Sequence, residues 1–439
     1  MSRAAAAAII ALLAAGAVLA DDDADRIRRA VAHTLATQLP NGLFRYDFDF
    51  LAGEPTGQDN IVRQAGTLFA LGEYLVDTGD PAVVLPLRAG FDALSQRSLP
   101  IGTGTLQALL EQLGVFAIDS GRLTRALERN GLLYEPGGDG RVVSGDGSYA
   151  GAYAGATALA LIAELEYLRA TGDGRYRELR EGWLRGLLSL RVPGGGIRES
   201  PITLRTGPYV DGETWLALAL YHEAFPDDSA AVQALAELED YVLDRYGQQP
   251  NRLFYHWGAL ASAARLPTGD PARLVEFAAD QAAFILDAVP PADTRDRSSC
   301  SLVEGLASAI AVVGSRPGRE ELLARMRERV AVELAQNRAL QIRPRQDRLE
   351  LGAGGLLMAP TFSGYDGAFL AGRYRAFTRT DLTQHCISAL LIARRHGLNG
   401  IESEIPRGGT PARSETAPSE RLEDPTSNDG LPLGHPAVR

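Results

Sequence analysis

The sequence contains no lysine, and all 44 of its basic residues are arginine. Without a lysine amine the chain cannot form a Schiff base, which excludes pyridoxal-dependent catalysis, and it cannot supply the lysine of a phosphate-binding P-loop. Cysteine is almost as scarce, with 2 residues in 439, too few for a disulfide-stabilised scaffold. The net charge of −11 argues against nucleic acid or an anionic membrane as the main partner, because binding phosphate groups requires a basic surface.

The N-terminus has the pattern of a secretory signal peptide. Arg3 precedes an apolar run that starts at Ala4 and ends at Val18-Leu19-Ala20, just before three aspartates. We therefore expect residues 1–20 to be cleaved and the mature protein to be periplasmic or secreted, with no membrane contact after cleavage. A retained anchor is the alternative, since the run is at the short limit for a membrane-spanning helix. At the other end, residues 398–439 are rich in Pro, Ser, Glu and Gly, which predicts a disordered tail.

Between these ends, apolar segments occur in pairs. The tripeptide Thr-Gly-Asp begins at Thr78, Thr171 and Thr268, each time between one helical segment and the next, and turns of this composition join antiparallel helices. The first members of the pairs are apolar on nearly all sides, which predicts buried helices. They cover residues 60–77, 149–170, 212–225, 253–266, 299–313 and 380–396.

The second members are amphipathic, so each should lie outside a buried helix with one apolar stripe facing inward. A sixth amphipathic segment, residues 24–37, completes the set and pairs with the last inner helix. Residues 21–397 are therefore predicted to form one all-α domain, an (α/α)6 toroid of six helical hairpins. The other amphipathic segments cover residues 81–97, 174–190, 228–245, 270–289 and 318–337.

The connections predict which end of the ring carries the function. Those from an outer to an inner helix are mostly long, over residues 38–59, 98–148, 191–211 and 338–379, and long loops on one face of a rigid scaffold are usually functional. All of them arrive at the N-termini of inner helices, where free N–H groups and the helix dipole favour anionic groups. We expect a pocket at this end.

Polar and aromatic residues gather in the first turns of the inner helices. An ionisable group is rarely buried without a partner, so we assign catalytic roles to those that lie inside apolar segments. The aspartates also occupy positions where helix N-caps occur, and the tryptophan is equally consistent with core packing. The predicted catalytic residues are Glu213, Glu304, Asp381 and His256; the predicted substrate-binding residues are Asp59, Arg63, Tyr149, Tyr209, Asp211, Trp257, Gln384 and His385.

These residue types favour acid–base chemistry on a carbohydrate. Two carboxylates in a partly desolvated cleft can hold different pKa values, so that Glu213 and Glu304 would act as acid and base in an unassigned order. Aromatic rings beside carboxylates and amides suit a sugar, and Arg63 could bind the carboxylate of a uronate. No cofactor is predicted. A Ser-His-Asp triad is not indicated, because no Gly-x-Ser-x-Gly elbow precedes a helix in the required context.

Several segments together resemble the six-hairpin glycosidase superfamily, in particular proteins related to uronyl-epimerase C-terminal domains and toroidal sugar hydrolases or epimerases. The resemblance implies a toroid that acts on a glycan, and leaves hydrolysis, elimination and epimerisation open. A glycan-binding envelope protein without catalytic activity is a second hypothesis. The segments that carry the resemblance are Asp59–Thr67, Gly212–Thr214, Tyr255–Trp257, Val303–Leu306 and Asp381–His385.

The two cysteines depart from this pattern. Cys300 and the pair His385-Cys386 begin adjacent inner helices, and the chain is similar in this respect to toroidal cyclases and prenyltransferases that bind zinc through Cys and His. A zinc site formed by Cys300, His385 and Cys386 is thus one alternative, with a zinc-dependent cyclase or transferase as the third function. A disulfide between the cysteines, or two unlinked thiols, are the others. The oligomeric state is not predicted.

Overall fold

The computed structural model describes residues 23–101, 140–201, 203, 205–343, 345–351, 355–358 and 360–399. The expected signal peptide and the expected tail beyond residue 399 lie outside the described residues, as does most of the connection predicted over 98–148. Among the helices that the structure describes, none is both long and apolar enough to span a bilayer.

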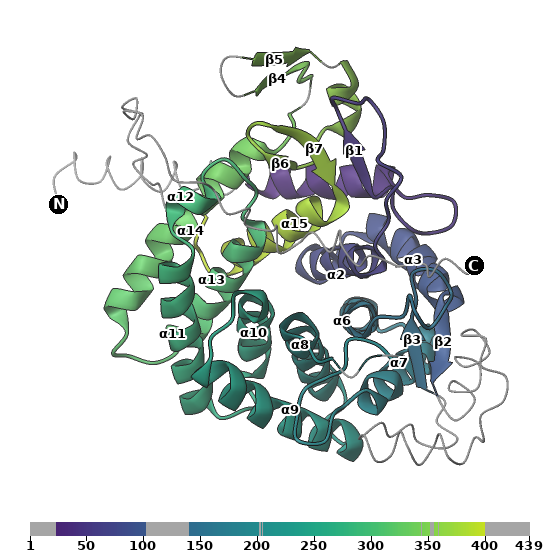
Figure 1. Cartoon of the computed structure of the whole chain (residues 1–439), viewed down its shortest axis with the longest axis vertical. Coiled ribbons are helices and arrows are strands. Elements are labelled where there is room, and N and C mark those ends of the chain that lie inside the picture. Colours follow the sequence, from purple (N-terminus) through teal and green to yellow (C-terminus); the bar gives the residue numbers. More distant parts are fainter. Residues whose placement is uncertain are drawn as a thin grey trace, which may run out of the picture. The chain divides into compact units, whose positions relative to one another are not determined.

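Six inner helices of the described part form a closed ring, in which each contacts the next and the last contacts the first (Figure 1). Every residue from Ala154 to Tyr167 in the second of them is buried, as predicted for helices that are apolar on all sides. The inner helices are α2 (Ile61–Thr78), α6 (Ala154–Thr171), α8 (Pro208–Ala224), α10 (Arg252–Arg265), α13 (Cys300–Val313) and α15 (Thr380–Arg395).

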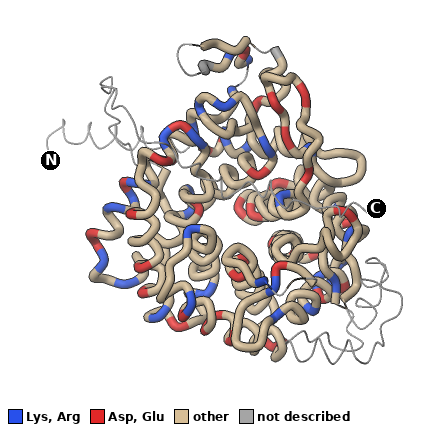
Figure 2. The backbone as a smooth tube through the Cα atoms, viewed as in Figure 1, with Lys and Arg blue, Asp and Glu red and all other residues tan. Residues whose placement is uncertain are grey.

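Amphipathic helices surround this ring, and many of the charged residues lie along them (Figure 2). In α9, for example, Leu235, Leu238 and Val242 are buried on one side of the helix, so the apolar stripe faces the inner helices as predicted. The fold class, an all-α toroid of six hairpins, is confirmed. The outer helices are α3 (Val84–Gln96), α7 (Arg177–Ser189), α9 (Ser229–Gln248), α11 (Pro271–Ala288), α14 (Glu320–Leu340) and a helix over residues 23–36.

The repeated Thr-Gly-Asp tripeptide forms the turn between an inner and an outer helix. Gly79 has φ of 67°, in the left-handed region that favours glycine, and its N–H bonds the carbonyl of Leu75 to end α2. Asp80 then accepts a hydrogen bond from the backbone of Ala82 and begins the next helical segment. Gly172, with φ of 68°, ends α6 in the same way. Short helical turns occur at η1 (Pro81–Val83), η2 (Gly174–Tyr176), α12 (Pro291–Thr294) and η4 (Pro360–Tyr365).

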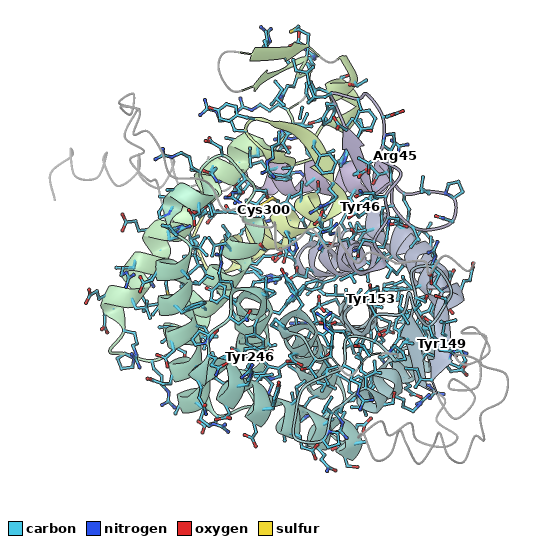
Figure 3. The ribbon with its side chains drawn as sticks, viewed as in Figure 1. Arg45, Tyr46, Tyr149, Tyr153, Tyr246 and Cys300 are labelled. Atoms are coloured by element: carbon cyan, nitrogen blue, oxygen red, sulfur yellow. A yellow bond between two sulfur atoms is a disulfide. The ribbon has the colours of Figure 1, made fainter. Side chains whose placement is uncertain are left out.

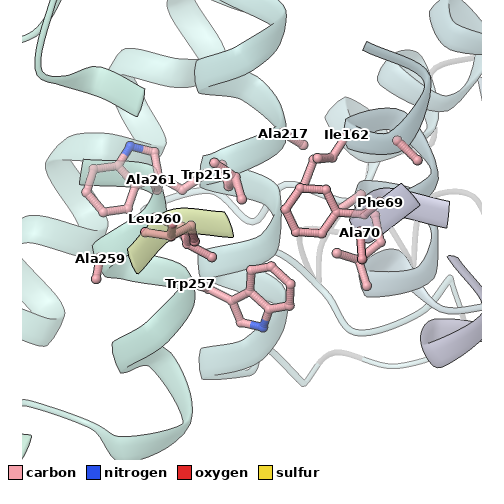
Figure 4. Close-up of a cluster of buried hydrophobic side chains, with 14 of the residues drawn as sticks. Phe69, Ala70, Ile162, Trp215, Ala217, Trp257, Ala259, Leu260 and Ala261 are labelled. Atoms are coloured by element: carbon pink, nitrogen blue, oxygen red, sulfur yellow. The ribbon is translucent and has the colours of Figure 1, made fainter. Parts of the chain in front are cut away.

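Glycines at the helix crossings let the inner helices approach closely. A Cβ added at Gly305 of α13 would lie 3.1 Å from the Cα of His256 on α10, and one at Gly66 of α2 would lie 2.6 Å from the side-chain amide of Gln384 on α15. Large apolar side chains fill the remaining space, among them Phe69 and Trp257 (Figure 4). Because the helices touch through glycine, polar side chains from different helices come within hydrogen-bonding reach of one another.

The long connections contain short antiparallel strands, which the sequence analysis did not predict. The three-stranded sheet has the order β1-β7-β6 and places Asp47 opposite Arg379. It leads directly into α15, because β7 ends at Arg379 and the helix begins at Thr380. The strands are β1 (Asp47–Asp49), β6 (Leu370–Gly372) and β7 (Arg375–Arg379) in this sheet, and the two-stranded ribbons β2 (Ser98–Ile101) with β3 (Gly140–Val143) and β4 (Arg348–Leu351) with β5 (Gly355–Met358).

Candidate active site

A buried histidine–carboxylate pair joins two neighbouring inner helices at the N-terminal end of the ring. His385, on the second turn of α15, places Nδ1 2.8 Å from Oε2 of Glu304, on the second turn of α13. Burial favours the neutral imidazole, but the carboxylates of Glu304 and Asp381 outweigh it and raise the pKa of His385 above its usual value. His385 is therefore held in its protonated form over a wider pH range than a free histidine.

A second histidine faces this pair and has the opposite electrostatic character. The ring of His256, on α10, meets that of His385 edge to face, with 5.6 Å between the centroids. Its Nε2 is buried and has no hydrogen-bond partner among the described residues. Burial, together with the nearby His385, lowers the pKa of His256 well below its usual value. The site thus contains a neutral imidazole beside one that tends to carry a proton.

Asp381 lies beside the histidine pair and is enclosed by arginines. Its carboxylate accepts two hydrogen bonds from Arg379, at 2.6 and 2.9 Å, and lies 3.1 Å from Nε of Arg63. Burial opposes ionisation, yet Arg379 and Arg63 hold the pKa of Asp381 below its usual value. Arg63 also donates to the hydroxyl of Tyr46. The charge of Arg63 is therefore engaged by Asp381, and its binding of a substrate carboxylate stays a prediction.

A small hollow opens onto this cluster between α2, α10, α13 and α15. Trp257 forms one wall and packs near Phe69, with ring centroids 6.2 Å apart. The structure therefore brings four predicted site residues, Trp257, Glu304, Gln384 and His385, to one hollow. The residues that line it are Gly66, Phe69, Ala70, Trp257, Glu304, Gln384, His385 and Ser388.

Glu213 occupies a different place on the ring. It is buried on α8, and its Oε2 lies so close to Gly155 of α6 that a Cβ there would be 2.2 Å away. Burial raises the pKa of Glu213 to about 8. Among the described residues no hydrogen bond or ion pair joins Glu213 to Glu304, so the two glutamates proposed as acid and base do not form a contacting pair.

The predicted aspartates do not cap their helices. Asn60 caps α2, while Asp59 is exposed and accepts a hydrogen bond from Gln64 at 2.8 Å. Asp211 is buried in the first turn of α8 and accepts hydrogen bonds from the backbone of Ile197 at 2.8 Å and from the Tyr246 hydroxyl at 2.7 Å. Burial raises the pKa of Asp211 to about 6. These contacts tie the connections to the helices, and the substrate-binding roles of Asp59 and Asp211 stay predictions.

The two tyrosines predicted to bind substrate also make structural contacts. The hydroxyl of Tyr149 donates to the carbonyl of Pro100 at 2.8 Å. Tyr209 is half-buried on the first turn of α8 and packs against the main apolar core. Neither lines the hollow around His385.

The two cysteines form a disulfide, with their Cα atoms 4.9 Å apart. The zinc site suggested for Cys300, His385 and Cys386 is therefore wrong in this structure, because both thiolates are consumed in the S–S bond. Figure 3 labels Cys300 at the start of α13.

His256, Glu304 and His385 form another group whose residue types can bind a metal, and their candidate ligand atoms lie within 4.8 Å of one another. The 2.8 Å contact between Glu304 and His385 is shorter than the separation of about 3.3 Å expected for two ligand atoms on a tetrahedral zinc. Nδ1 of His385 and Oε2 of Glu304 therefore share a hydrogen bond in this structure.

The sequence analysis missed a polar pair beneath the hollow. Ser388, on α15, donates a hydrogen bond to the buried carboxylate of Glu73 on α2. Burial raises the pKa of Glu73 to about 7, against the opposing effects of Arg395 and Ser388. An acidic residue inside an apolar helical segment was the signal that could have identified Glu73, but only the fold shows that Ser388 and Glu304 lie near it.

No known protein-family profile and no curated protein sequence matches the chain. Solved structures do match its fold. An α-1,6-mannanase of Salegentibacter sp., in an inactive variant with two adjacent aspartates replaced by alanine, superposes with a TM-score of 0.53 at 12% identity, over 85% of this chain and 98% of the mannanase.

Two further similar structures are sugar-converting enzymes of other kinds. A cellobiose 2-epimerase of Spirochaeta thermophila has a TM-score of 0.51 at 14% identity, over 87% of this chain and 97% of its own. A D-mannose isomerase has a TM-score of 0.52 at 11% identity, over 85% and 97%. At these identities the likeness establishes the shared α/α toroid fold, as the sequence resemblance predicted.

Proposed function

We propose that the protein is a carbohydrate-active enzyme that epimerises or isomerises a reducing sugar by moving a proton at the carbon next to its carbonyl group. The observation that carries this proposal is a pair of neighbouring histidines, of which His385 lines the hollow and His256 contacts the ring of His385. His256 offers a buried, unpartnered Nε2, and His385, 5.6 Å away between ring centroids, is held towards its charged form by Glu304. One neutral and one charged imidazole at the same site are what a two-residue proton transfer requires.

In this mechanism the two imidazoles take complementary parts. Nε2 of His256 removes the proton from the carbon next to the carbonyl of the open-chain sugar, which leaves a planar enediolate. His385 supplies a proton to the other face of the same carbon, which restores the carbonyl and gives the epimer. Protonation of the former carbonyl carbon instead, with the neighbouring hydroxyl proton passing to the former carbonyl oxygen, gives the aldose–ketose isomer. Glu304 keeps His385 charged until it donates. Each imidazole ends in the state of the other, so His256 must lose a proton to solvent and His385 must take one up before the next turnover.

The surroundings of the histidines support a sugar as the substrate. Trp257 and Phe69 offer apolar faces, while Gln384 and Ser388 offer hydrogen-bonding groups, and this mixture suits the apolar faces and hydroxyl rims of sugars. In this structure the hollow has no room for a water molecule. Substrate binding therefore requires a side chain to move, and Gln384, which covers Gly66, is the flexible residue placed to do so.

The proposal is tested by incubating the protein with free mannose, glucose, fructose and cellobiose in D2O and following the sugars by proton NMR. We expect deuterium at the carbon next to the carbonyl, together with the epimer or isomer. His256→Asn and His385→Asn should abolish both signals, whereas His396→Asn, at an exposed position beyond α15, should leave them unchanged. Exchange that persists in both site variants would overturn the assignment.

Glycoside hydrolysis is the second candidate, and Glu213 is the observation that favours it. A carboxyl group with a pKa near 8 is protonated at neutral pH and can serve as a general acid. The mannanase of similar fold is inactive when two adjacent aspartates are replaced. The adjacent aspartates in the described part of this chain, Asp227 and Asp228, do not line the hollow, because they lie at the start of the outer helix α9. Release of reducing ends from a polysaccharide, lost in Glu213→Gln and with no deuterium exchange, would favour this reaction.

Two further assays distinguish the remaining hypotheses. Retention of glycans on an affinity gel without turnover would indicate a binding protein. Loss of activity on treatment with a chelator, restored by zinc, would indicate a metal-dependent enzyme.

We also propose export to the periplasm or beyond, supported by the Cys300–Cys386 disulfide, since such bonds persist in oxidising compartments.

A further inference from the structure

The disulfide lies next to the histidine–carboxylate pair on the same two helices. Cys300 is the first residue of α13, one turn before Glu304, and Cys386 directly follows His385 on α15. The bond joins positions 86 residues apart in the sequence, and their Cα atoms are 4.9 Å apart. Both cysteines are buried, with exposed fractions of 2% and 0%. A covalent link thus fixes the spacing of the two helices at the level where their side chains form the pair.

The pair is sensitive to that spacing. The contact of 2.8 Å between Nδ1 of His385 and Oε2 of Glu304 is no longer a hydrogen bond once the atoms are about 3.6 Å apart, so a shift of less than about 1 Å between the helices removes it. The backbone bond from Ser298 to Ala371, at 3.0 Å, also ties the start of α13 to the strand region before α15. It lies outside the helices, however, and does not join them at the level of Glu304 and His385.

We propose that the Cys300–Cys386 disulfide is a positioning element for the acid–base pair, and that the enzyme reaches full activity only when this bond is formed. The inference rests on the proposed function, because it treats Glu304 and His385 as part of the reaction. Formation of the bond removes two protons and two electrons from the two thiols, and a second disulfide, such as that of oxidised glutathione, accepts them. A dithiol reverses the step and becomes a cyclic disulfide.

The charged and titratable groups that face His385 come from each neighbouring element. Glu304 on α13 and Asp381 on α15 favour its protonated form, while Arg63 on α2 and the His256 ring on α10 do not. Separation of α13 from α15 removes the contribution of Glu304 alone. The apparent pKa of His385 should then fall, which moves the alkaline limb of the rate profile to lower pH.

The experiment compares the oxidised wild-type protein, the same protein reduced with dithiothreitol, and the double variant Cys300→Ser/Cys386→Ser, all assayed well below their unfolding temperatures as measured by circular dichroism. We expect kcat to fall by about 10- to 100-fold in the reduced protein and the variant, with KM nearly unchanged, and reoxidation of the reduced wild-type protein to restore kcat. Ser298→Ala, which keeps the disulfide and the Ser298 backbone, is the matched control and should retain the wild-type rate.

A direct titration separates this inference from the proposed function. The pKa of His385, followed by NMR of its ring protons without any sugar present, should be lower in the reduced protein than in the oxidised one. A lower unfolding temperature with unchanged kcat, pH profile and His385 titration would overturn the positioning role and leave the disulfide as a stabilising bond only. If the oxidised protein converts no sugar while the His385 pKa still depends on the disulfide, the proposed function fails and the positioning role stands.

Discussion

Two buried polar clusters adjoin the N-terminal part of α13, and they differ in how completely they are satisfied. In the first, the carboxylate of Glu333 on α14 accepts hydrogen bonds from Arg329 at 2.6 Å, Thr294 at 2.7 Å and Ser299 at 2.6 Å. In the second, Glu304 shares one hydrogen bond with His385. Facing it, Nε2 of His256 has no hydrogen-bond partner in the described part of the chain.

The difference distinguishes a cluster that stabilises the fold from one that can still bind a ligand. A buried carboxylate whose oxygens are all engaged has no free capacity for a ligand, and loss of one partner leaves an uncompensated charge. A buried ring nitrogen without a partner costs folding free energy unless a ligand or water completes it. The Arg329–Glu333 network thus has the contacts of a stabilising cluster, whereas the Glu304–His385–His256 cluster, for which we propose a role in the reaction, keeps an unpartnered ring nitrogen among the described residues.

The largest effect should come from Glu304→Gln. Loss of the carboxylate removes the group that keeps His385 charged, so kcat should fall by about 10²- to 10³-fold, while the unfolding temperature changes little. Because Glu304 raises the pKa of His385, the alkaline limb of the rate profile should move to lower pH. Glu328→Gln, at an exposed position on α14, is the control. A wild-type rate in Glu304→Gln would assign this cluster to structure as well.

The opposite result, a loss of stability with little change in rate, is expected for the Arg329–Glu333 network. Arg329→Met leaves the buried Glu333 without its cation, so the free energy of unfolding should fall by about 3–5 kcal/mol, while kcat of the remaining folded protein should stay within a fewfold of wild type. Urea titration and steady-state kinetics at low temperature measure the two quantities. An unchanged unfolding midpoint would show that Glu333 is not charged in the folded protein.

Glu213 gives an effect that depends on pH. Its pKa in the folded protein is raised to about 8, from 4.5 when exposed, so the folded state binds the proton more tightly than the unfolded state. The contribution of Glu213 to the free energy of unfolding is therefore largest below about pH 4.5. It declines by a few kcal/mol in total as the pH rises from there to about 8. Glu213→Gln should flatten the decline in unfolding temperature between these pH values. An equally steep decline in the variant would mean that Glu213 is solvated.

The smallest effect is expected at the surface. Arg273 and Asp240 form an ion pair of 2.8 Å between α11 and α9, but both side chains are more than half exposed. Solvent screens such a pair, so Asp240→Asn should change the free energy of unfolding by less than about 1 kcal/mol and leave kcat unaltered. A larger loss of unfolding free energy would show that this exposed pair stabilises the fold as buried networks do.

Much of the architecture could be predicted because it depends on local patterns. Segments such as Ala154–Tyr167, apolar on all sides, have to be buried, and the Thr-Gly-Asp turns at Thr78 and Thr171 contain the glycine and aspartate that end one helix and begin the next. The strands within the connections were missed, since β1 and β7 are short and are held mainly by each other and by contacts distant in sequence.

The candidate site residues were chosen from the sequence, whereas their pairing was not predicted. His256, Glu304 and His385 stood out as ionisable groups within apolar helices, and all three meet near the hollow. That Glu304 pairs with His385, and not with Glu213, depends on which helices are neighbours and on how each is rotated about its axis.

The sequence by itself determined the alternation of buried and amphipathic helices, the end of the ring that carries polar groups, and the exclusion of lysine chemistry, because each follows from composition or from spacing along one helix. Only the tertiary structure decided that Cys300 bonds Cys386 and that Asp381 is enclosed by Arg63 and Arg379. It also decided that Nε2 of His256, beside His385, has no hydrogen-bond partner among the described residues. These facts are distances between residues far apart in the chain, and they are set by how closely the glycines let the helices approach.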